Sequence, residues 1–179
     1  MQRRKFLSVL SAVATVAATR SFAETAPADG KVTIMRFSDD GKPLGSVTVA
    51  KVNKVAEWKQ RLSPLAYNVT REEGTERPFS QPGYDRHEPG LYRCVCCDNA
   101  LFNANTKYDS HTGWPSFWQP IAAENVHNIA DNLFGMTRTE VKCTLCDAHL
   151  GHVFDDGPKP TGLRYCMNTV ALRFVPGKI

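Results

Sequence analysis

Two Cys-x-x-Cys pairs constrain this chain more than any other feature of its sequence. The first pair is Cys94 and Cys97, the second is Cys143 and Cys146, and 45 residues lie between them. Each pair can turn two sulfurs toward one point, and two such turns together form the tetrahedral four-sulfur cage that Zn²⁺ favours. Four thiolates leave no ligand position for water or substrate. The pattern therefore predicts one structural zinc ion, whose binding free energy contributes to folding.

Alternatives remain open for these cysteines. Iron also occupies four-sulfur cages, and cysteines of exported proteins commonly form disulfides. Cys96, inside the first pair, is a competing ligand in place of Cys94, a redox partner, or a buried spectator. We interpret it as a spectator.

The first 23 residues predict a cleaved export signal. Basic Arg3, Arg4 and Lys5 precede a mildly apolar run over residues 6–19, and small residues lead to a cleavage site after Ala23. The apolar run is shorter than the roughly 20 residues that cross a bilayer, so no stable membrane anchor is expected. The arginine pair resembles the bacterial twin-arginine signal, which predicts a periplasmic or otherwise exported protein. An ordinary secretory leader is the alternative.

The charge of the chain is concentrated in this leader. The formal net charge is +4, and residues 1–23 hold four basic residues and no acidic residue, so the remaining chain is balanced. No nucleic-acid partner is therefore expected. A length of 179 residues with 42% apolar content predicts one domain over residues 55–179, after a signal peptide (1–23) and a spacer with a β-hairpin (24–54).

The local patterns predict a mainly β (α+β) fold. Two β-prone runs, 32–37 and 45–49, flank a turn and predict the hairpin. Apolar residues at helical spacing predict a short helix over residues 55–65. Short β-prone runs follow among glycines and prolines, at 92–95, 126–129, 137–142 and 168–175. This spacing predicts antiparallel β-structure with a few small helices.

Two further groups of residues could carry chemistry. Arg164 lies two residues before Cys166, and a nearby cation favours the nucleophilic thiolate, although a lone cysteine near a strand is often only a small buried hydrophobe. His149 and His152 suit acid or hydrogen-bond roles, because sulfur already satisfies the zinc. Binding to local backbone is the alternative for both histidines. The aromatic turn at 113–118 is either core or the wall of an apolar pocket.

Five segments resemble, in the same order, those of the B-type methionine-R-sulfoxide reductases. They are residues 70–79, 107–110, 113–117, 149–154 and 164–168, and the resemblance extends from about residue 58 to residue 174. It implies a pair of antiparallel β-sheets with peripheral helices. It also implies reduction of methionine R-sulfoxide, free or in oxidised proteins, with Cys166 as nucleophile and a cysteine sulfenic acid as the immediate product.

The resemblance assigns roles to other residues of this chain. Trp114 would pack against the S-methyl group of the substrate, and we expect Phe154 and Arg164 to line the same site. The sulfoxide oxygen leaves only when it is protonated or strongly hydrogen-bonded, so the nucleophile needs an acid nearby. The implied residues around this oxygen and the attacking sulfur are His149, His152 and Asn168. The implied zinc ligands are Cys94, Cys97, Cys143 and Cys146.

Thr112 departs from the family pattern. Many members have a cysteine at this place that resolves the sulfenic acid as an internal disulfide, and threonine cannot form that bond. We expect a thioredoxin-like protein or another external thiol to reduce Cys166 directly. Resolution by Cys96 is the alternative, and it requires the two cysteines to come within disulfide reach.

Two other classes of function compete with this interpretation. In a non-catalytic zinc-ribbon-like binding module, the aromatic turn would be an interaction surface and Cys166 would be inert to alkylation. A general thiol peroxidase would turn over peroxide about as well as sulfoxide. Neither accounts for both histidines and Trp114 as economically as a sulfoxide pocket does.

Overall fold

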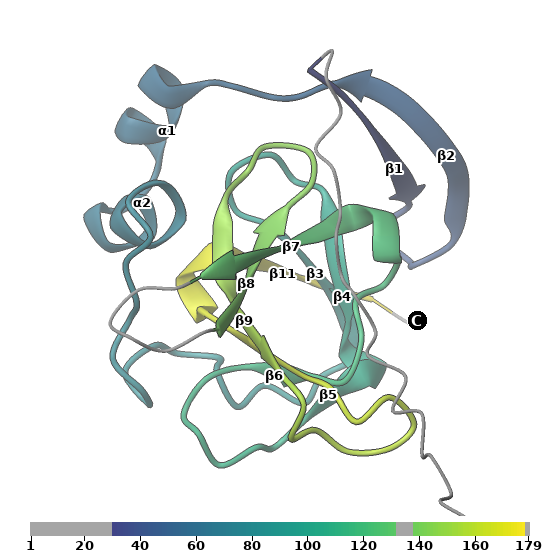
Figure 1. Cartoon of the computed structure of the whole chain (residues 1–179), viewed down its shortest axis with the longest axis vertical. Coiled ribbons are helices and arrows are strands. Elements are labelled where there is room, and N and C mark those ends of the chain that lie inside the picture. Colours follow the sequence, from purple (N-terminus) through teal and green to yellow (C-terminus); the bar gives the residue numbers. More distant parts are fainter. Residues whose placement is uncertain (1–29, 132–137, 178–179) are drawn as a thin grey trace, which may run out of the picture.

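The structure is a computed structural model that describes residues 30–131 and 138–177. The predicted signal peptide lies outside the described residues, as do residues 24–29 of the predicted spacer. The described residues form three antiparallel β-sheets, two short α-helices and several 3₁₀ turns (Figure 1). Within these two ranges, no helix combines the length and apolar character that a membrane span requires.

The largest sheet has the strand order β5-β6-β10-β9-β8-β7, and all its neighbouring strands are antiparallel. Strand β10, which carries Cys166, lies between β6 and β9 and is therefore central. This order brings three distant parts of the chain side by side. The strands are β5 (Lys107–Tyr108), β6 (Ser116–Phe117), β7 (Val126–Asp131), β8 (Arg138–Cys143), β9 (His149–Phe154) and β10 (Arg164–Met167).

A smaller sheet of order β11-β3-β4 packs on the first through aromatic side chains. Its strands are β3 (Gly90–Cys94), β4 (Ala100–Asn103) and β11 (Leu172–Pro176). Phe102 of β4 stacks on Phe117 of β6 at 4.4 Å between ring centroids, and Tyr92 of β3 meets Phe117 edge-on at 5.0 Å. Such aromatic pairs stabilise the core beyond their buried area. These two sheets correspond to the predicted pair.

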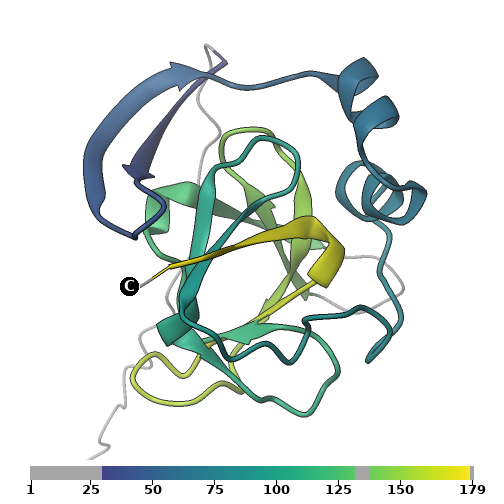
Figure 2. The ribbon, with the colours of Figure 1, turned by 180° about the vertical axis from the view of Figure 1, so that it is seen from behind.

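The predicted hairpin is confirmed, but it forms a third sheet of its own. Strand β1 (Lys31–Phe37) pairs with β2 (Pro43–Ala50), and neither joins the larger sheets within the described part of the chain. The prediction of two sheets is therefore incomplete, because the hairpin forms a third. The hairpin lies on one flank of the larger sheets and the α-helices lie on the other, in both views (Figures 1 and 2).

The hairpin is fixed to the body of the protein at Asn125. This residue ends the 3₁₀ helix η2 (Ala123–Asn125) and is fully buried. Its Oδ1 accepts from the Met35 amide at 2.8 Å, and its Nδ2 donates to the Met35 carbonyl at 2.9 Å. Val32 and Ile34 of β1 are also buried. Residues 31–50 are thus a docked part of the structure.

The prediction of a single helix over residues 55–65 is wrong. Two helices are present, α1 (Val55–Arg61) and α2 (Pro64–Arg71). Pro64 has no amide hydrogen and its ring clashes with a preceding helical turn, so the first helix must end before it. Pro64 instead begins α2, where the Ser63 hydroxyl caps the helix by accepting from the Ala66 amide at 3.1 Å.

The other predicted strands differ from the structure mainly at their ends. The runs 92–95, 126–129 and 137–142 match β3, β7 and β8 within two residues. The run 168–175 begins instead as the 3₁₀ helix η4 (Thr169–Ala171) before β11, and a similar turn, η1 (Ala104–Thr106), follows β4. The amides of Thr169 and Val170 bind the Glu76 carboxylate and so are not available to a strand partner.

Candidate active site

Cys166 belongs to a row of side chains that crosses the six-stranded sheet. Directly paired residues on neighbouring strands point to the same face of a sheet. Cys166 of β10 pairs with Ser116 of β6 on one side and with His152 of β9 on the other. His152 pairs in turn with Glu140 of β8. The strand register therefore places a thiol beside an imidazole.

A cavity of about 140 Å³ opens at this row. Five of the predicted site residues share its wall, which places aromatic, imidazole, amide and thiol groups around one small space. Two larger hollows, of about 620 and 310 Å³, have neither Cys166 nor a predicted histidine among their described wall residues. The wall of the smaller cavity consists of Thr75, Trp114, Arg138, Gly151, His152, Phe154, Cys166, Met167 and Asn168.

Burial raises the pKa of the Cys166 thiol. The Thr112 hydroxyl, 3.9 Å from Cys166 Sγ, and the positive charge of Arg164 both act in the opposite direction and favour the thiolate. Arg164 therefore lowers the pKa of the thiol as predicted, but the desolvation of the thiolate raises this pKa by more. Cys166 of the free protein is consequently a thiol at neutral pH.

Arg164 is oriented by two neighbours besides Cys166. Its Nε and Nη2 each donate to the Asp156 carboxylate at 2.8 Å, in the bidentate geometry that orients a guanidinium. The same guanidinium lies over the Phe154 ring, 4.3 Å from its centroid. Arg164 is not among the residues that line the cavity, and it acts on the site through Phe154 and through its charge and side-chain interaction with Cys166.

His152 is the histidine that faces the cavity. Its Nε2 lies 3.0 Å from Oδ2 of Asp131, which also accepts from Arg138 at 2.7 Å. Burial lowers the pKa of His152, and the Asp131 carboxylate offsets part of this effect. A neutral imidazole therefore lies beside Cys166 at neutral pH, with a carboxylate placed to stabilise a proton that it takes up.

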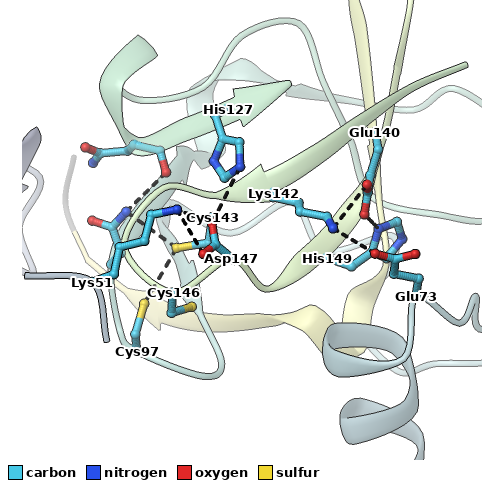
Figure 3. Close-up of polar contacts among 12 residues, drawn as sticks. Lys51, Glu73, Cys97, His127, Glu140, Lys142, Cys143, Cys146, Asp147 and His149 are labelled. Carbon is cyan, nitrogen blue, oxygen red and sulfur yellow. Dashed lines mark hydrogen bonds and ion pairs between the residues drawn. The ribbon is translucent and has the colours of Figure 1, made fainter. Parts of the chain in front are cut away.

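His149 lies behind this wall and is not one of the cavity residues. Its Nδ1 is 2.6 Å from Oε1 of Glu140, and Lys142 links this carboxylate to Glu73, as Figure 3 shows. The ring is 5.4 Å from that of His152, centroid to centroid. Its buried Nε2 has no hydrogen-bond partner among the described residues. A direct contact of His149 with substrate stays a prediction.

Asn168 joins the cavity to a buried acid, Glu76, that sequence reasoning did not single out. Asn168 Oδ1 accepts from the Glu76 amide at 3.0 Å, and Nδ2 donates to the Leu150 carbonyl at 3.1 Å. The Glu76 side chain accepts from the amides of Thr169 and Val170 at 2.7 and 3.0 Å. Glu76 is only 2% exposed. No local sequence signal distinguishes such an acid from a solvated one in a loop.

Trp114 is positioned by the same segment. Its indole Nε1 donates to the Glu76 carbonyl at 3.2 Å. Gly113, immediately before it, has a φ of +86°, and a Cβ there would lie 2.7 Å from the Phe79 amide nitrogen. A glycine is required because this conformation and this close approach exclude a side chain. The loop around residues 76–79 thus sets the position of the indole.

The four predicted zinc ligands come together away from the cavity. The sulfurs of Cys94, Cys97, Cys143 and Cys146 all lie within 4.8 Å of one another. Two of these sulfur pairs are 3.7 and 3.6 Å apart, too far for a disulfide. A tetrahedral zinc with Zn–S bonds of about 2.3 Å has sulfur–sulfur edges of about 3.8 Å. The donor set and its spacing therefore fit a four-thiolate metal site.

The two cysteine turns have the same backbone geometry. In each turn, the amide after the second cysteine donates to the carbonyl of the first, from Asp98 at 2.9 Å and from Asp147 at 2.8 Å. Both aspartates have positive φ values, which aspartate tolerates better than most residues. Lys51, from the segment after the hairpin, binds Asp147 at 2.7 Å, and His127 approaches the same carboxylate (Figure 3).

Cys96 lies inside the first turn and is not one of the four clustered sulfurs. Its side chain contacts the sulfurs of Cys94 and Cys146 and the Thr70 hydroxyl. The groups around the Cys166 sulfur are different ones, on Thr112, Ser116 and Arg164. The described structure thus places Cys96 at the four-cysteine group and Cys166 at the cavity, and all six cysteines of the chain are unpaired.

Comparison with known proteins places this arrangement in a family. The SelR domain model matches residues 62–176. The chain is 57% identical over 116 residues to "Peptide methionine sulfoxide reductase MsrB" of Thioalkalivibrio sulfidiphilus, covering 65% of this chain and 85% of that protein. It is 48% identical over 134 residues to the protein of the same name from Agrobacterium fabrum, covering 74% and 99%.

A plant protein is similar over the same region. "Peptide methionine sulfoxide reductase B1, chloroplastic" of Arabidopsis thaliana is 55% identical over 118 residues, covering 65% of this chain and 58% of the plant protein. The predicted resemblance is therefore confirmed at the level of family. The chain belongs to the SelR-domain family of MsrB-type peptide methionine sulfoxide reductases.

Proposed function

We propose that the chain reduces methionine R-sulfoxide to methionine at the cavity beside Cys166. The observation that supports this site best is the shared cavity wall, in which one thiol lies with Trp114, Phe154 and His152. The aromatic rings provide an apolar surface for the methyl group, and the imidazole provides a proton. Fixing the methyl group and the oxygen in different places selects one sulfoxide epimer.

The reaction begins at Cys166. Its thiolate attacks the sulfoxide sulfur, and the oxygen must gain a proton before its bond to sulfur breaks. His152 first takes up the proton of the Cys166 thiol, since Asp131 stabilises its imidazolium form, and then gives this proton to the oxygen. Asn168 Nδ2 retains a second hydrogen beyond the one it donates to Leu150, and this hydrogen binds the oxygen. The oxygen leaves methionine as hydroxide, which attacks the Cys166 sulfur and breaks its new bond to the methionine sulfur, and the electron pair of that bond stays with methionine. Methionine thereby gains two electrons, and Cys166 loses two to become a sulfenic acid.

Recycling of Cys166 uses an external thiol. One thiol attacks the sulfenic acid, which releases water and forms a mixed disulfide, and a second thiol then frees Cys166. Thr112, the hydroxyl residue beside Cys166 Sγ, cannot form a disulfide. Cys96 faces the four-cysteine group instead. After one equivalent of substrate, mass spectrometry should find no Cys96–Cys166 disulfide, and finding one would overturn direct reduction.

Zinc is the metal that the four-cysteine group would hold. Cys94 ends β3 of the smaller sheet and Cys97 lies in the turn after it, whereas Cys143 ends β8 of the larger sheet and Cys146 lies in the turn that leads to β9. A bound ion ties the two sheets together through four thiolates. Its role is structural, and the sulfoxide chemistry takes place at Cys166.

We also infer that the protein is exported by the twin-arginine route. The paired arginines and the short apolar run of the leader support this inference. A protein exported in its folded state carries its metal with it, so its four thiols are protected from oxidation outside the cytoplasm. Cell fractionation of Arg3→Lys/Arg4→Lys and unaltered chains tests the route. Uncleaved, cytoplasmic unaltered protein would contradict it.

The activity is tested with separate R and S epimers of a methionine sulfoxide and a dithiol donor. The unaltered protein should reduce the R epimer only, and Cys166→Ser should reduce neither. A peptide-bound sulfoxide assayed beside the free amino acid shows which substrate is preferred. Absence of activity with several thiol donors would favour a zinc-bound interaction module instead.

A further inference from the structure

A chain of three hydroxyl groups leads away from Cys166. The Thr112 hydroxyl is 3.9 Å from Cys166 Sγ and 2.8 Å from the Ser110 hydroxyl. Ser110 is in turn 2.7 Å from the Ser116 hydroxyl. Ser116 is 0% exposed, and its hydroxyl is 3.3 Å from the Trp114 carbonyl, so the chain ends on an acceptor.

This chain can be oriented in two ways, because each hydroxyl carries one hydrogen and also accepts. In the first orientation, the Cys166 thiol donates to Thr112 and each hydroxyl donates onward until Ser116 reaches the Trp114 carbonyl. In the second, all three hydroxyls rotate, Ser116 donates to Ser110, Ser110 to Thr112, and Thr112 to the sulfur. Of the two orientations, only the second turns the Thr112 hydroxyl hydrogen toward a negative sulfur.

We propose that the Ser116–Ser110–Thr112 chain is a reversible hydrogen-bond relay that stabilises the charged forms of Cys166, with Thr112 as the donor to the reacting sulfur. The relay donates to the thiolate before attack. It donates in the same way to the sulfenic oxygen afterwards, so the intermediate is held until an external thiol arrives. Linked hydroxyls polarise one another, so the terminal donor is stronger than an isolated threonine.

This relay rests on the function proposed above and adds a donor that the predicted site did not include. Thr112 was predicted only as a residue unable to resolve the sulfenic acid. Thr112 contacts the Cys166 sulfur directly, and buried Ser116 is the strand partner of Cys166. These two positions give Thr112 a chemical role as a hydrogen-bond donor. The effect of Thr112 on the thiol pKa is in the expected direction, since its hydroxyl lowers this pKa, and Ser116 lowers it as well through its own interaction with the sulfur.

Several charged or titratable groups also act on Cys166, and the test must separate the relay from them. They come from each element packed around the sulfur. Among the described residues they are Arg164 of β10, Tyr108 of β5, His152 of β9, Arg138 of β8 and Asp156 after β9. None of them is altered by a substitution at position 112, so a matched pair of variants there isolates the hydroxyl.

The test is the rate of Cys166 alkylation as a function of pH in the zinc-loaded full-length protein, followed by peptide mass mapping. Thr112→Val keeps the shape and removes the hydroxyl, whereas Thr112→Ser keeps the hydroxyl. At pH 7.5 we expect Cys166 of T112V to be alkylated about three- to tenfold more slowly than Cys166 of the unaltered protein. The midpoint of its pH–rate profile should lie about 0.5 to 1 pH unit higher. T112S should match the unaltered protein. Ser110→Ala, which shortens the chain but keeps Thr112, should fall between.

The lifetime of the sulfenic acid provides a second measurement. After one equivalent of R-sulfoxide, a dimedone-type probe should trap about threefold less sulfenic acid in T112V than in T112S. Equal alkylation of T112V and unaltered protein would overturn the relay, as would equal impairment of T112V and T112S. The alkylation assay contains no sulfoxide, so its outcome does not depend on the proposed function. A failure of that function would appear separately, as R-sulfoxide that the unaltered protein does not reduce.

Discussion

At the scale of single residues, the contact between the Trp114 indole and the substrate can be tested directly by substitution. The indole lines the cavity, and the hydrogen bond to the Glu76 carbonyl sets its position. Trp114→Ala removes the apolar surface for the S-methyl group, which corresponds to about 1 to 2 kcal/mol of lost contact. We expect KM to rise about tenfold, with a smaller change in kcat.

Trp118 provides the matched control for this substitution. It lies four residues further along the chain, directly after β6, and is partly exposed, but it is not a wall residue of the cavity. Steady-state kinetics with the R epimer should show an unchanged KM for Trp118→Ala. An equal rise in KM for both variants would mean that the turn, rather than the Trp114 ring, determines binding.

A substitution of Glu76 that hardly changes the size of the side chain should lower the free energy of unfolding substantially. Both carboxylate oxygens accept backbone amides, from Thr169 and Val170. Glu76→Gln replaces one oxygen by a donor that faces another donor in a buried site. We expect a decrease of about 2 to 3 kcal/mol in the free energy of unfolding.

Denaturant unfolding measures this loss, and Glu72→Gln is the control. Glu72 is an exposed residue that ends α2, and its hydrogen bond to Asn68 lies at the surface. Its substitution should change stability by less than about 0.5 kcal/mol. A similar small change for Glu76→Gln would show that the buried amides find water or other acceptors.

At the element scale, the β1–β2 hairpin depends on Asn125. Its side chain binds both backbone groups of Met35 and also donates to the Ala100 carbonyl at 2.7 Å. Asn125→Ala leaves these groups buried and unpaired, so we expect a destabilisation of about 2 to 4 kcal/mol. Amide hydrogen exchange should show faster exchange throughout residues 31–50 than in the six-stranded sheet.

Asn128→Ala is the comparison for this variant. Asn128 lies on β7 near Asn125, but its Oδ1 has no hydrogen-bond partner among the described residues. The hairpin of that variant should keep its protection from exchange. Loss of protection in both variants would mean that β7, and not the Asn125 side chain, fixes the hairpin.

At the scale of the whole molecule, the four-cysteine group connects the two larger sheets. Removing the metal should lower the thermal midpoint by about 10 °C or more, because the ion binds only the folded arrangement. Cys146→Ser should release bound zinc to a chromogenic chelator and unfold at a lower temperature. Calorimetry and zinc analysis of the same samples measure both effects.

Cys96→Ser separates the metal site from the remaining thiol of the first turn. Cys96 contacts the cluster but is not one of its four converging sulfurs. The variant should keep one zinc per chain and a thermal midpoint close to that of the unaltered protein. If Cys96→Ser lost its zinc and Cys94→Ser kept it, Cys96 would be the metal ligand in place of Cys94.

Much of this organisation was predictable from local pattern. The hairpin followed from two β-prone runs around a turn, and β3, β7 and β8 from short runs of the same kind. The break at Pro64 was missed because the apolar spacing continues across it, while the proline and the Ser63 cap determine where the helices end. Strands β9 and β10 carry His152 and Cys166, and they were recognised as motifs rather than as strands.

The family and the group of four thiols could be predicted from the sequence alone, because both depend on residue types at fixed spacing along the chain. Only the tertiary structure separated His152, which faces the cavity, from His149, which binds Glu140. It alone revealed Glu76 and the Ser110–Thr112 hydroxyl pair beside Cys166. The contacts of Glu76 with Thr169 and of Thr112 with Cys166 join residues far apart in the sequence, and strand register, burial and loop packing decide which residues meet.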